Sequence, residues 1–322
     1  MRSPLQGGLP PVDRVDGTVV EIACDESGFT GTNLLDPASP IITHASVDLT
    51  VDEAVELVAT LRSGFQFSTY EFKSGHFLRS PGATEALEWC LARMRGRAYV
   101  HLINKEFFLV TRIVDLLLAE PSYAAGTHLT QAQRPAARTL YRTGRAYGRD
   151  WQAFLSAFVE LFRVKRRRHP DPVVVQRFFQ ARDELRPAVE LLGALDRDRV
   201  EGVLTRLFDD DPSIPPPLEP MLPALAETVL FWSGEQRRRV LVTHDEQSAL
   251  TAVRLRRLQA ALADGDGATP LAGLTMADSR DDPRIQVADL LAGVALRLPD
   301  SDFVSPNSLR DPPRAGCVGG DG

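Results

Sequence analysis

The sequence lacks the features that mark several large classes of protein. Its 322 residues contain no apolar run near the roughly 18 residues that a membrane-spanning helix needs. Residues 1–15 include no apolar core, so we expect no secretory signal. Cys24, Cys90 and Cys317 stand too far apart for a zinc motif or a disulfide framework. We therefore expect a cytoplasmic protein with reduced thiols and no membrane contact.

Lysine is also scarce, because only three of the 37 basic residues are lysines and the others are arginines. We interpret this bias as the mark of a GC-rich coding background, which makes the number of arginines weak evidence for any function. The formal net charge of −6 means that a nucleic-acid surface must be a local patch. Clusters of basic residues at 163–168, 237–239 and 254–257 would suit phosphates, and they would equally suit solvated helix faces.

What the sequence does contain is the composition of a globular protein and an α/β pattern near its N-terminus. Hydrophobic residues make up 43% of the chain and charged residues 25%, which is ordinary for a folded domain. Apolar and β-branched residues predict strands at 19–24, 41–47 and 98–103. A helix is expected at 51–64, after a Thr50-x-x-Glu53 capping box, and another at 83–95.

The pattern changes in the middle of the chain and returns later. From about residue 106 to 232 strand-like alternation disappears. Helical periodicity replaces it at 107–118, 151–162 and 187–208. Strands are then expected again at 239–243 and 271–276, and helices at 247–262 and 285–298.

These elements predict an α/β fold that is built from both ends of the chain. Residues 16–104 and 236–298 would form the core, and a mainly helical insertion would occupy 105–235. Residues 299–322 are rich in Pro, Gly and Asp without periodicity, so we expect a disordered tail there.

Four acidic residues lie where an α/β fold places ligands. Asp25 and Asp245 each follow a predicted strand, and ligand sites form beyond the carboxyl ends of strands. Asp289 lies in a helix that is apolar almost all round, on the same face as Gln286. A buried carboxylate there needs a partner, and a shared divalent cation is one that would serve. Glu71 is in a loop without a clear structural frame.

Each of these acids also has an ordinary structural interpretation. Asp245 precedes a predicted helix and would serve as its cap. Asp25 would stabilise a turn through its own backbone. Asp289 would pair with an arginine, and Glu71 with Lys73 would form an exposed ion pair of little energetic weight. The sequence alone leaves these alternatives open.

Residues next to the acids are candidates for supporting positions. Adjacent strand residues point to opposite faces, so Glu26 and His244 would face away from Asp25 and Asp245. A nucleophilic triad of Ser27, His244 and Asp245 is disfavoured, because Ser27 lacks the Gly-x-Ser-x-Gly elbow of hydrolases. We therefore expect Asp25 and Asp245 to belong to the site, with the other three in support.

Several short motifs occur in a fixed order along the two α/β parts of the chain. They are Asp25-Glu26-Ser27-Gly28, Glu71-Phe72-Lys73, His244-Asp245-Glu246, and Asp278-Ser279 followed by Ile285-Gln286-Val287-Ala288-Asp289. In this combination the chain resembles the bacterial family called domain of unknown function 3800, which is grouped with the ribonuclease H-like superfamily. The resemblance covers about 19–73 and 240–298, and it does not extend to the helical middle.

The resemblance implies a ribonuclease H-like mixed sheet flanked by helices and a site that hydrolyses phosphodiesters. Its catalytic and metal-binding carboxylates would be Asp25, Glu71, Asp245 and Asp289, which would hold Mg²⁺ or Mn²⁺. Lys73 would contact phosphate or orient Glu71. The substrate would be DNA or RNA, and the oligomeric state stays open.

Two other functions remain on the sequence evidence. The first is a non-catalytic module that uses the same fold to bind nucleic acid or a protein. The second is a metal-assisted hydrolase that acts on a small phosphorylated molecule. Cleavage of labelled nucleic acid, or its absence, separates the first from the nuclease interpretation.

Overall fold

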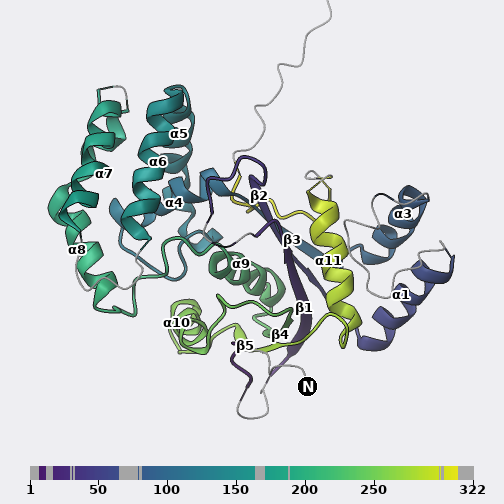
Figure 1. The fold of residues 1–322 in the computed structure, drawn as a ribbon. Coiled ribbons are helices and arrows are strands. Elements are labelled where there is room, and N and C mark those ends of the chain that lie inside the picture. Colours follow the sequence, from purple (N-terminus) through teal and green to yellow (C-terminus); the bar gives the residue numbers. More distant parts are fainter. Residues whose placement is uncertain are drawn as a thin grey trace, which may run out of the picture.

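The fold is built on one mixed β-sheet of five strands (Figure 1). We describe it from a computed structural model, which places residues 7–11, 17–29, 31, 33–64, 79, 82–163, 171–187, 189–296, 298 and 301–310. The strands are β1 (Val19–Ser27), β2 (Ile41–Val47), β3 (Ala98–Asn104), β4 (Arg239–His244) and β5 (Leu271–Met276). Their order is β3-β2-β1-β4-β5, with antiparallel pairs on the β2 side of β1 and parallel pairs on the β4 side.

The central strand β1 is buried on both faces, and its sequence shows why. Val20, Ile22 and Cys24 alternate with Ala23 and Asp25, so each face of the strand meets a separate apolar cluster. Gly28 follows the last residue of the strand, and its φ of 80° is a conformation that glycine adopts readily. A Cβ at Gly28 would collide with the carbonyl oxygen of Ile41, so this glycine lets the chain turn close to β2.

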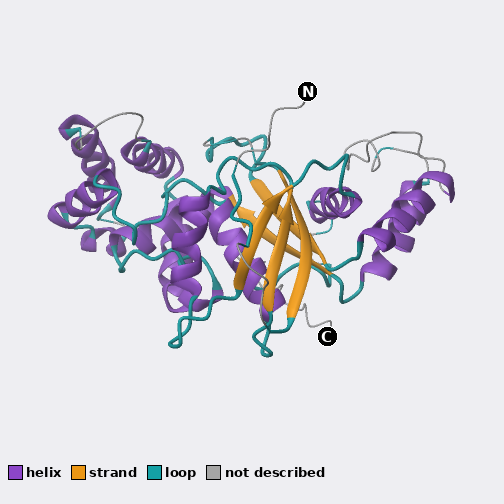
Figure 2. Cartoon of the chain, turned by 90° about the horizontal axis from the view of Figure 1, so that it is seen from below, coloured by secondary structure: helices purple, strands orange, loops and turns teal. Residues whose placement is uncertain are grey.

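Helices cover both faces of the sheet (Figures 1 and 2). One face carries α1 (Val51–Gly64), α3 (Ala83–Met94) and α11 (Pro283–Ala295). The other face carries α9 (Met221–Ser233) and α10 (Ala252–Leu262), with the helical middle of the chain beyond them. The helix predicted at 51–64 is confirmed, including its capping box, because Thr50 N–H donates to Glu53 Oε2 and Glu53 N–H donates to Thr50 Oγ1.

The middle of the chain is helical, as the sequence predicts, but one predicted helix is wrong. The helices are α4 (Lys105–Leu117), α5 (Arg134–Arg145), α6 (Gly148–Phe162), α7 (Pro172–Leu185) and α8 (Arg197–Phe208), with 3-10 turns at His128–Gln133 and Glu190–Ala194. The single helix expected at 187–208 is instead a 3-10 turn followed by α8. The break lies at Asp196, whose side chain accepts a hydrogen bond from Arg199 N–H and starts a new helix.

Helix α9 lies within the range that the sequence assigns to the insertion, yet it packs directly on the sheet. It contacts β2, β3 and β4, and most of its residues are buried. Trp232 donates from Nε1 to Ser46 Oγ of β2 at 2.8 Å. Among the described residues, no helix is long and apolar enough to cross a membrane.

The expectation that the chain is disordered from residue 299 is wrong for 301–310. This segment lies along β3, where Val100 N–H donates to Phe303 O and Asn104 N–H donates to Leu309 O. Leu309 is fully buried. The sequence pattern misses the segment because β3 supplies its hydrogen bonds, so it needs no periodicity of its own. At the other edge, Leu9 and Leu274 of β5 exchange two backbone hydrogen bonds.

Removing the Leu309 side chain tests whether this segment contributes to folding. We expect Leu309→Ala to lower the free energy of unfolding by about 2–5 kcal/mol, the cost typical of a buried leucine. The measurement is chemical denaturation followed by circular dichroism. Val173→Ala is the matched control, because Val173 is 63% exposed and its loss should change stability by less than about 0.5 kcal/mol. Equal effects of the two substitutions would contradict the packing described for 301–310.

Candidate functional site

Asp25 and Asp245 are brought together by the parallel pairing of β1 and β4. Cys24 is in register with His244, and Asp245 N–H donates to Cys24 O at 3.1 Å. The two aspartates therefore occupy neighbouring positions at the carboxyl ends of adjacent strands, which lie about 4.8 Å apart. Asp25 is only 8% exposed, and its Oδ1 accepts the backbone N–H of Glu26 at 2.7 Å.

Helix α11 brings Asp289 to the same place. Near its start, Arg284 Nη2 donates to Thr243 Oγ1 of β4 at 3.3 Å. Near its end, Thr43 Oγ1 of β2 donates to the carbonyl oxygen of Ala292 at 2.8 Å. Between these two anchors the helix packs on β1, the strand that lies between β4 and β2, and Asp289 is in this part.

The electrostatics of Asp25 reflect this grouping. Burial raises its pKa well above the usual value, and the charges of Glu26, Asp245 and Asp289 raise the pKa further. The N–H of Glu26 has the opposite, smaller effect. Three of the four acids predicted from the sequence thus interact in the folded chain, although they come from three distant segments. Glu71, the fourth, and Lys73 lie outside the described residues.

Glu26 extends the acidic group to the opposite face of β1. Its Oε1 accepts a hydrogen bond of 2.6 Å from Nε2 of Gln247, whereas its buried Oε2 has no hydrogen-bond partner among the described residues. Burial raises the pKa of Glu26 to about 7, and the charges of Asp245 and Glu219 raise it while the bond from Gln247 lowers it. Glu26 was expected only as a supporting residue, but it shares its electrostatic environment with Asp245.

Glu219 is a member of this group that the sequence analysis misses. It lies just before α9, where its Oε1 accepts a hydrogen bond from Met221 N–H at 3.2 Å. Burial raises the pKa of Glu219 to about 7, against the effects of the Met221 N–H and of Arg254. The surrounding Pro-rich turn carries no motif, so no sequence signal could have identified this residue.

The remaining supporting residues have defined structural contacts. His244 is fully buried, with Nε2 3.1 Å from His44 Nε2 and Nδ1 2.9 Å from the carbonyl oxygen of Asp245. Both ring nitrogens are engaged, which argues against a triad with Ser27, a partly exposed residue at the end of β1. Gln286 accepts from Arg62 of α1 and donates to Ser279 O, so its amide orients α11.

The alternative role of Asp245 as a helix cap is wrong. Helix α10 begins at Ala252 instead of residue 247, and Thr251 is its cap, with Oγ1 accepting from Arg254 N–H. Asp25 likewise lies within β1, where its side chain bonds the next residue and stabilises no turn of the kind considered from the sequence. Asp245 therefore caps no described helix and Asp25 stabilises no such turn, although both lie at strand ends.

The basic clusters are partly engaged in ion pairs. Arg237 pairs with Asp264, and Arg257 pairs with Asp210. Arg254 lies near the acids, since its charge lowers the pKa of Glu219. Residues 164–168 of the first cluster lie outside the described part of the chain.

The donor set can be compared with the needs of a metal ion. Among the described residues, no three His, Cys, Asp or Glu side chains form a group that could hold a metal. A closed zinc site, which takes four protein ligands, therefore does not fit these residues. Mg²⁺ usually binds through one or two carboxylates, keeps several waters and contacts a substrate phosphate. Asp25 and Asp245, two neighbouring carboxylates that repel each other, suit such an ion.

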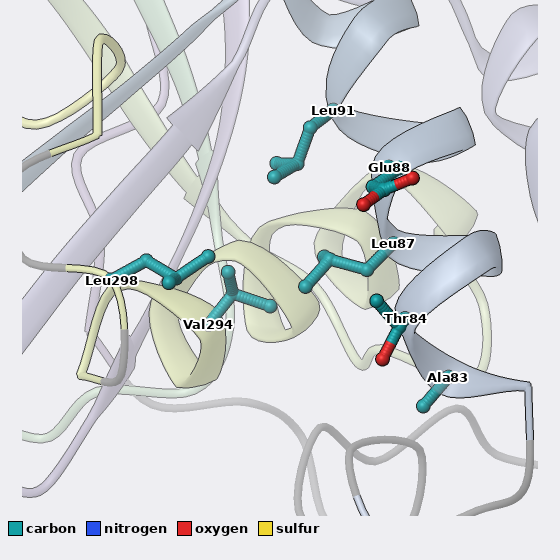
Figure 3. Close-up of a pocket in the computed structure, with 7 residues that line it drawn as sticks. All are labelled: Ala83, Thr84, Leu87, Glu88, Leu91, Val294 and Leu298. Carbon is teal, nitrogen blue, oxygen red and sulfur yellow. The ribbon is translucent and has the colours of Figure 1, made fainter.

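A separate pocket of about 350 Å³ lies between α3 and α11 (Figure 3). Leu87 and Leu91 of α3 face Val294 and Leu298 across it, and Glu88 is the one charged residue among the described residues that line it. Asp25, Glu26, Glu219, Asp245 and Asp289 do not line this pocket, so it is separate from the described acids.

Comparisons with known proteins identify no relative of the chain. No protein-family model, no curated protein and no solved structure matches it. Any function must therefore be argued from the arrangement of the residues.

The raised pKa of Glu219 predicts how stability depends on pH. Between about pH 4.5 and 7 the folded protein binds a proton that the unfolded chain has lost, so its free energy of unfolding falls as pH rises. Below about pH 4.5 the carboxyl group is protonated in both states, so it causes no loss of stability. Above about pH 7 it is ionised in both states, so the loss of stability no longer changes. We expect Glu219→Gln to remove up to about 3 kcal/mol of this fall. The measurement is urea denaturation of both proteins at a series of pH values, which gives the free energy of unfolding at each pH. EDTA is present to remove metal ions.

Glu56→Gln is the control for this experiment, because Glu56 is exposed on α1. It should leave the pH dependence of stability as in the wild type. A Glu219→Gln protein with the same pH dependence as the wild type would show that Glu219 ionises normally in the folded state.

Proposed function

We propose that the protein is a metal-dependent phosphodiesterase that cleaves nucleic acid. The observation that carries this proposal is the electrostatic coupling of Asp25 with Asp245 and Asp289 at the carboxyl ends of two parallel strands. Clustered carboxylates repel one another, and a divalent cation offsets that repulsion. Carboxylates and water are also the ligands that Mg²⁺ prefers.

The fold supports the same proposal. A mixed sheet flanked by helices agrees with the ribonuclease H-like core that the resemblance to the domain of unknown function 3800 family implies. The motif residues also lie in the expected contexts: Asp25 at the end of β1, Asp245 after β4, and Asp289 inside the buried helix α11.

Each residue of the site would have a distinct role. Asp25 and Asp245 would hold Mg²⁺ or Mn²⁺, and Asp289, whose charge raises the pKa of Asp25, would contact the ion through one of its waters. Such an ion activates water and stabilises charge on phosphate oxygens when bound. Glu26 would take up and release a proton at Oε2, since its pKa of about 7 lies near neutral pH. Gln247 fixes the other oxygen of Glu26 and thereby orients the carboxyl group.

A second function, a non-catalytic binding module, is favoured by one observation. Within the described residues the acids do not form a group of three that could hold a metal. Such a module would bind nucleic acid or a protein through the same fold, and substitutions of the acids would not affect it.

A cleavage assay separates these functions. We expect labelled DNA or RNA to be cut in Mn²⁺ or Mg²⁺, and Asp25→Asn and Asp289→Asn each to slow cutting by more than about a hundredfold. The reason is that even residues that only contact metal ligands cost about 10- to 100-fold when changed. Asp52→Asn is the matched control, because Asp52 is exposed on α1.

The outcomes of this assay are distinct. Binding of the nucleic acid without cleavage, unchanged in Asp25→Asn, would favour the module. Activity on bis-p-nitrophenyl phosphate together with no binding of oligonucleotides would indicate a hydrolase of small phosphorylated molecules.

Thermal melting tests metal binding without any substrate. We expect Mn²⁺ at a hundredfold excess over its Kd to stabilise the wild type by about 2.7 kcal/mol, since the ion binds only the folded state. The resulting rise in Tm should be absent in Asp25→Asn and present in Asp52→Asn. A wild-type protein whose Tm is unchanged by millimolar Mn²⁺ would contradict a metal site at Asp25.

A further inference from the structure

A buried chain of hydrogen bonds connects α9 to the backbone of Asp245. Thr228 Oγ1 of α9 lies 3.0 Å from His44 Nδ1, and His44 Nε2 lies 3.1 Å from His244 Nε2. His244 Nδ1 is in turn 2.9 Å from the carbonyl oxygen of Asp245. The side chains of Thr228, His44 and His244 are all fully buried. Because β1 lies between β2 and β4, the two imidazoles meet across the central strand.

The carbonyl oxygen of Asp245, at one end of these hydrogen bonds, determines which atom is the donor in each of them. A carbonyl oxygen only accepts, so Nδ1 of His244 must carry a hydrogen, and in a neutral ring its Nε2 is then an acceptor. Nε2 of His44 must therefore carry a hydrogen and donate it to His244. This leaves Nδ1 of His44 as an acceptor, and the hydroxyl of Thr228 donates to it. The two histidines are thus in opposite tautomers.

The burial of the rings agrees with this assignment, which requires both to be neutral. Both rings are fully buried, and burial disfavours the charged form of an imidazole. The 3.1 Å contact between the two Nε2 atoms also requires one of them to accept a hydrogen bond, so the two rings cannot both be charged.

Asp245 is held by its backbone on both sides. Its N–H donates to Cys24 O of β1, and its carbonyl oxygen accepts from His244. The carboxylate of Asp245 extends from a Cα whose two peptide groups are both fixed. The next residues of this loop lead to Gln247, which bonds Glu26, so the orientation of the loop affects both faces of the acidic site.

We propose that Thr228 and His44 act through His244 as positioning residues for Asp245, so that α9 sets the geometry of the acidic site. This role rests on the proposed function, because it assigns Asp245 to the catalytic carboxylates. None of the three side chains needs to touch the substrate. Their effect is to select one orientation of the Asp245 peptide group, through hydrogen bonds that only one pair of tautomers satisfies.

Nuclear magnetic resonance tests the protonation pattern directly. In ¹⁵N-labelled wild type, long-range ¹H–¹⁵N spectra should show His244 neutral and protonated at Nδ1, and His44 neutral and protonated at Nε2. Two rings in the same tautomer would overturn the proposal.

The role of α9 is tested with substitutions of Thr228. Thr228→Val removes the hydroxyl and keeps the shape, so it should shift the ring signals of both histidines and the ¹³C signal of the Asp245 carbonyl. It should also lower kcat for Mn²⁺-dependent cleavage by about tenfold, with KM unchanged. Thr228→Ser keeps the hydroxyl and should restore both readouts.

Thr111→Val is the matched control. Thr111 is also buried, and its hydroxyl donates to the carbonyl oxygen of Phe108 within α4, away from this chain. Its loss should affect stability without moving the histidine signals, the Asp245 signal or kcat. An Asp245 signal that Thr228→Val shifts no more than Thr111→Val does would overturn the proposal, as would an unchanged kcat in Thr228→Val.

Failure of this inference can be told apart from failure of the proposed function. If the wild type cleaves nothing and binds no Mn²⁺, the proposed function fails, and with it any catalytic role for the chain of hydrogen bonds. The tautomers and the Asp245 carbonyl signal would still show whether α9 controls the backbone of Asp245. If the wild type cleaves and those signals contradict the assignment, only the positioning role fails.

Discussion

The parallel pairing of β1 with β4 is the contact on which the acidic site depends. These strands are more than 200 residues apart in the sequence, and their register alone makes Asp25 and Asp245 neighbours. Helix α11 can add Asp289 only because it is anchored to the strands on either side of β1. A shift of the pairing by one residue would turn the carboxylates to opposite faces, so apolar burial on both faces of β1 also protects the site.

The sequence was sufficient to predict elements whose periodicity is local. The strands at 41–47 and 271–276 and the helix at 51–64 have the predicted bounds, because apolar spacing and the capping box define them. The helix expected at 187–208 was mispredicted because the local cap at Asp196 was overlooked. Within the expected tail, 301–310 was mispredicted because a contact outside the local pattern decides its structure. For the tail that contact is β3, whose backbone holds 301–310 in place.

The same distinction applies to the acidic site. Asp25, Asp245 and Asp289 were predictable, because each stands at a strand end or in a buried helix where an ordinary carboxylate is costly. Glu219 was not, because its position depends on how α9 packs on the sheet. Glu26 and Glu219 both have a pKa near 7, which reduces stability at neutral pH. Such a cost is expected where a fold serves a function at the expense of stability.

Both edges of the sheet are covered by segments near the ends of the described chain, 301–310 on β3 and 7–11 on β5. An uncovered edge strand offers its backbone to a second molecule, which leads to sheet extension or aggregation. Here the segment 301–310 bonds β3 at Val100 and Asn104, and Leu9 bonds β5 at Leu274, so backbone groups at both edges are already paired within the described chain. A chain shortened at either end would therefore expose unpaired backbone groups at a strand edge.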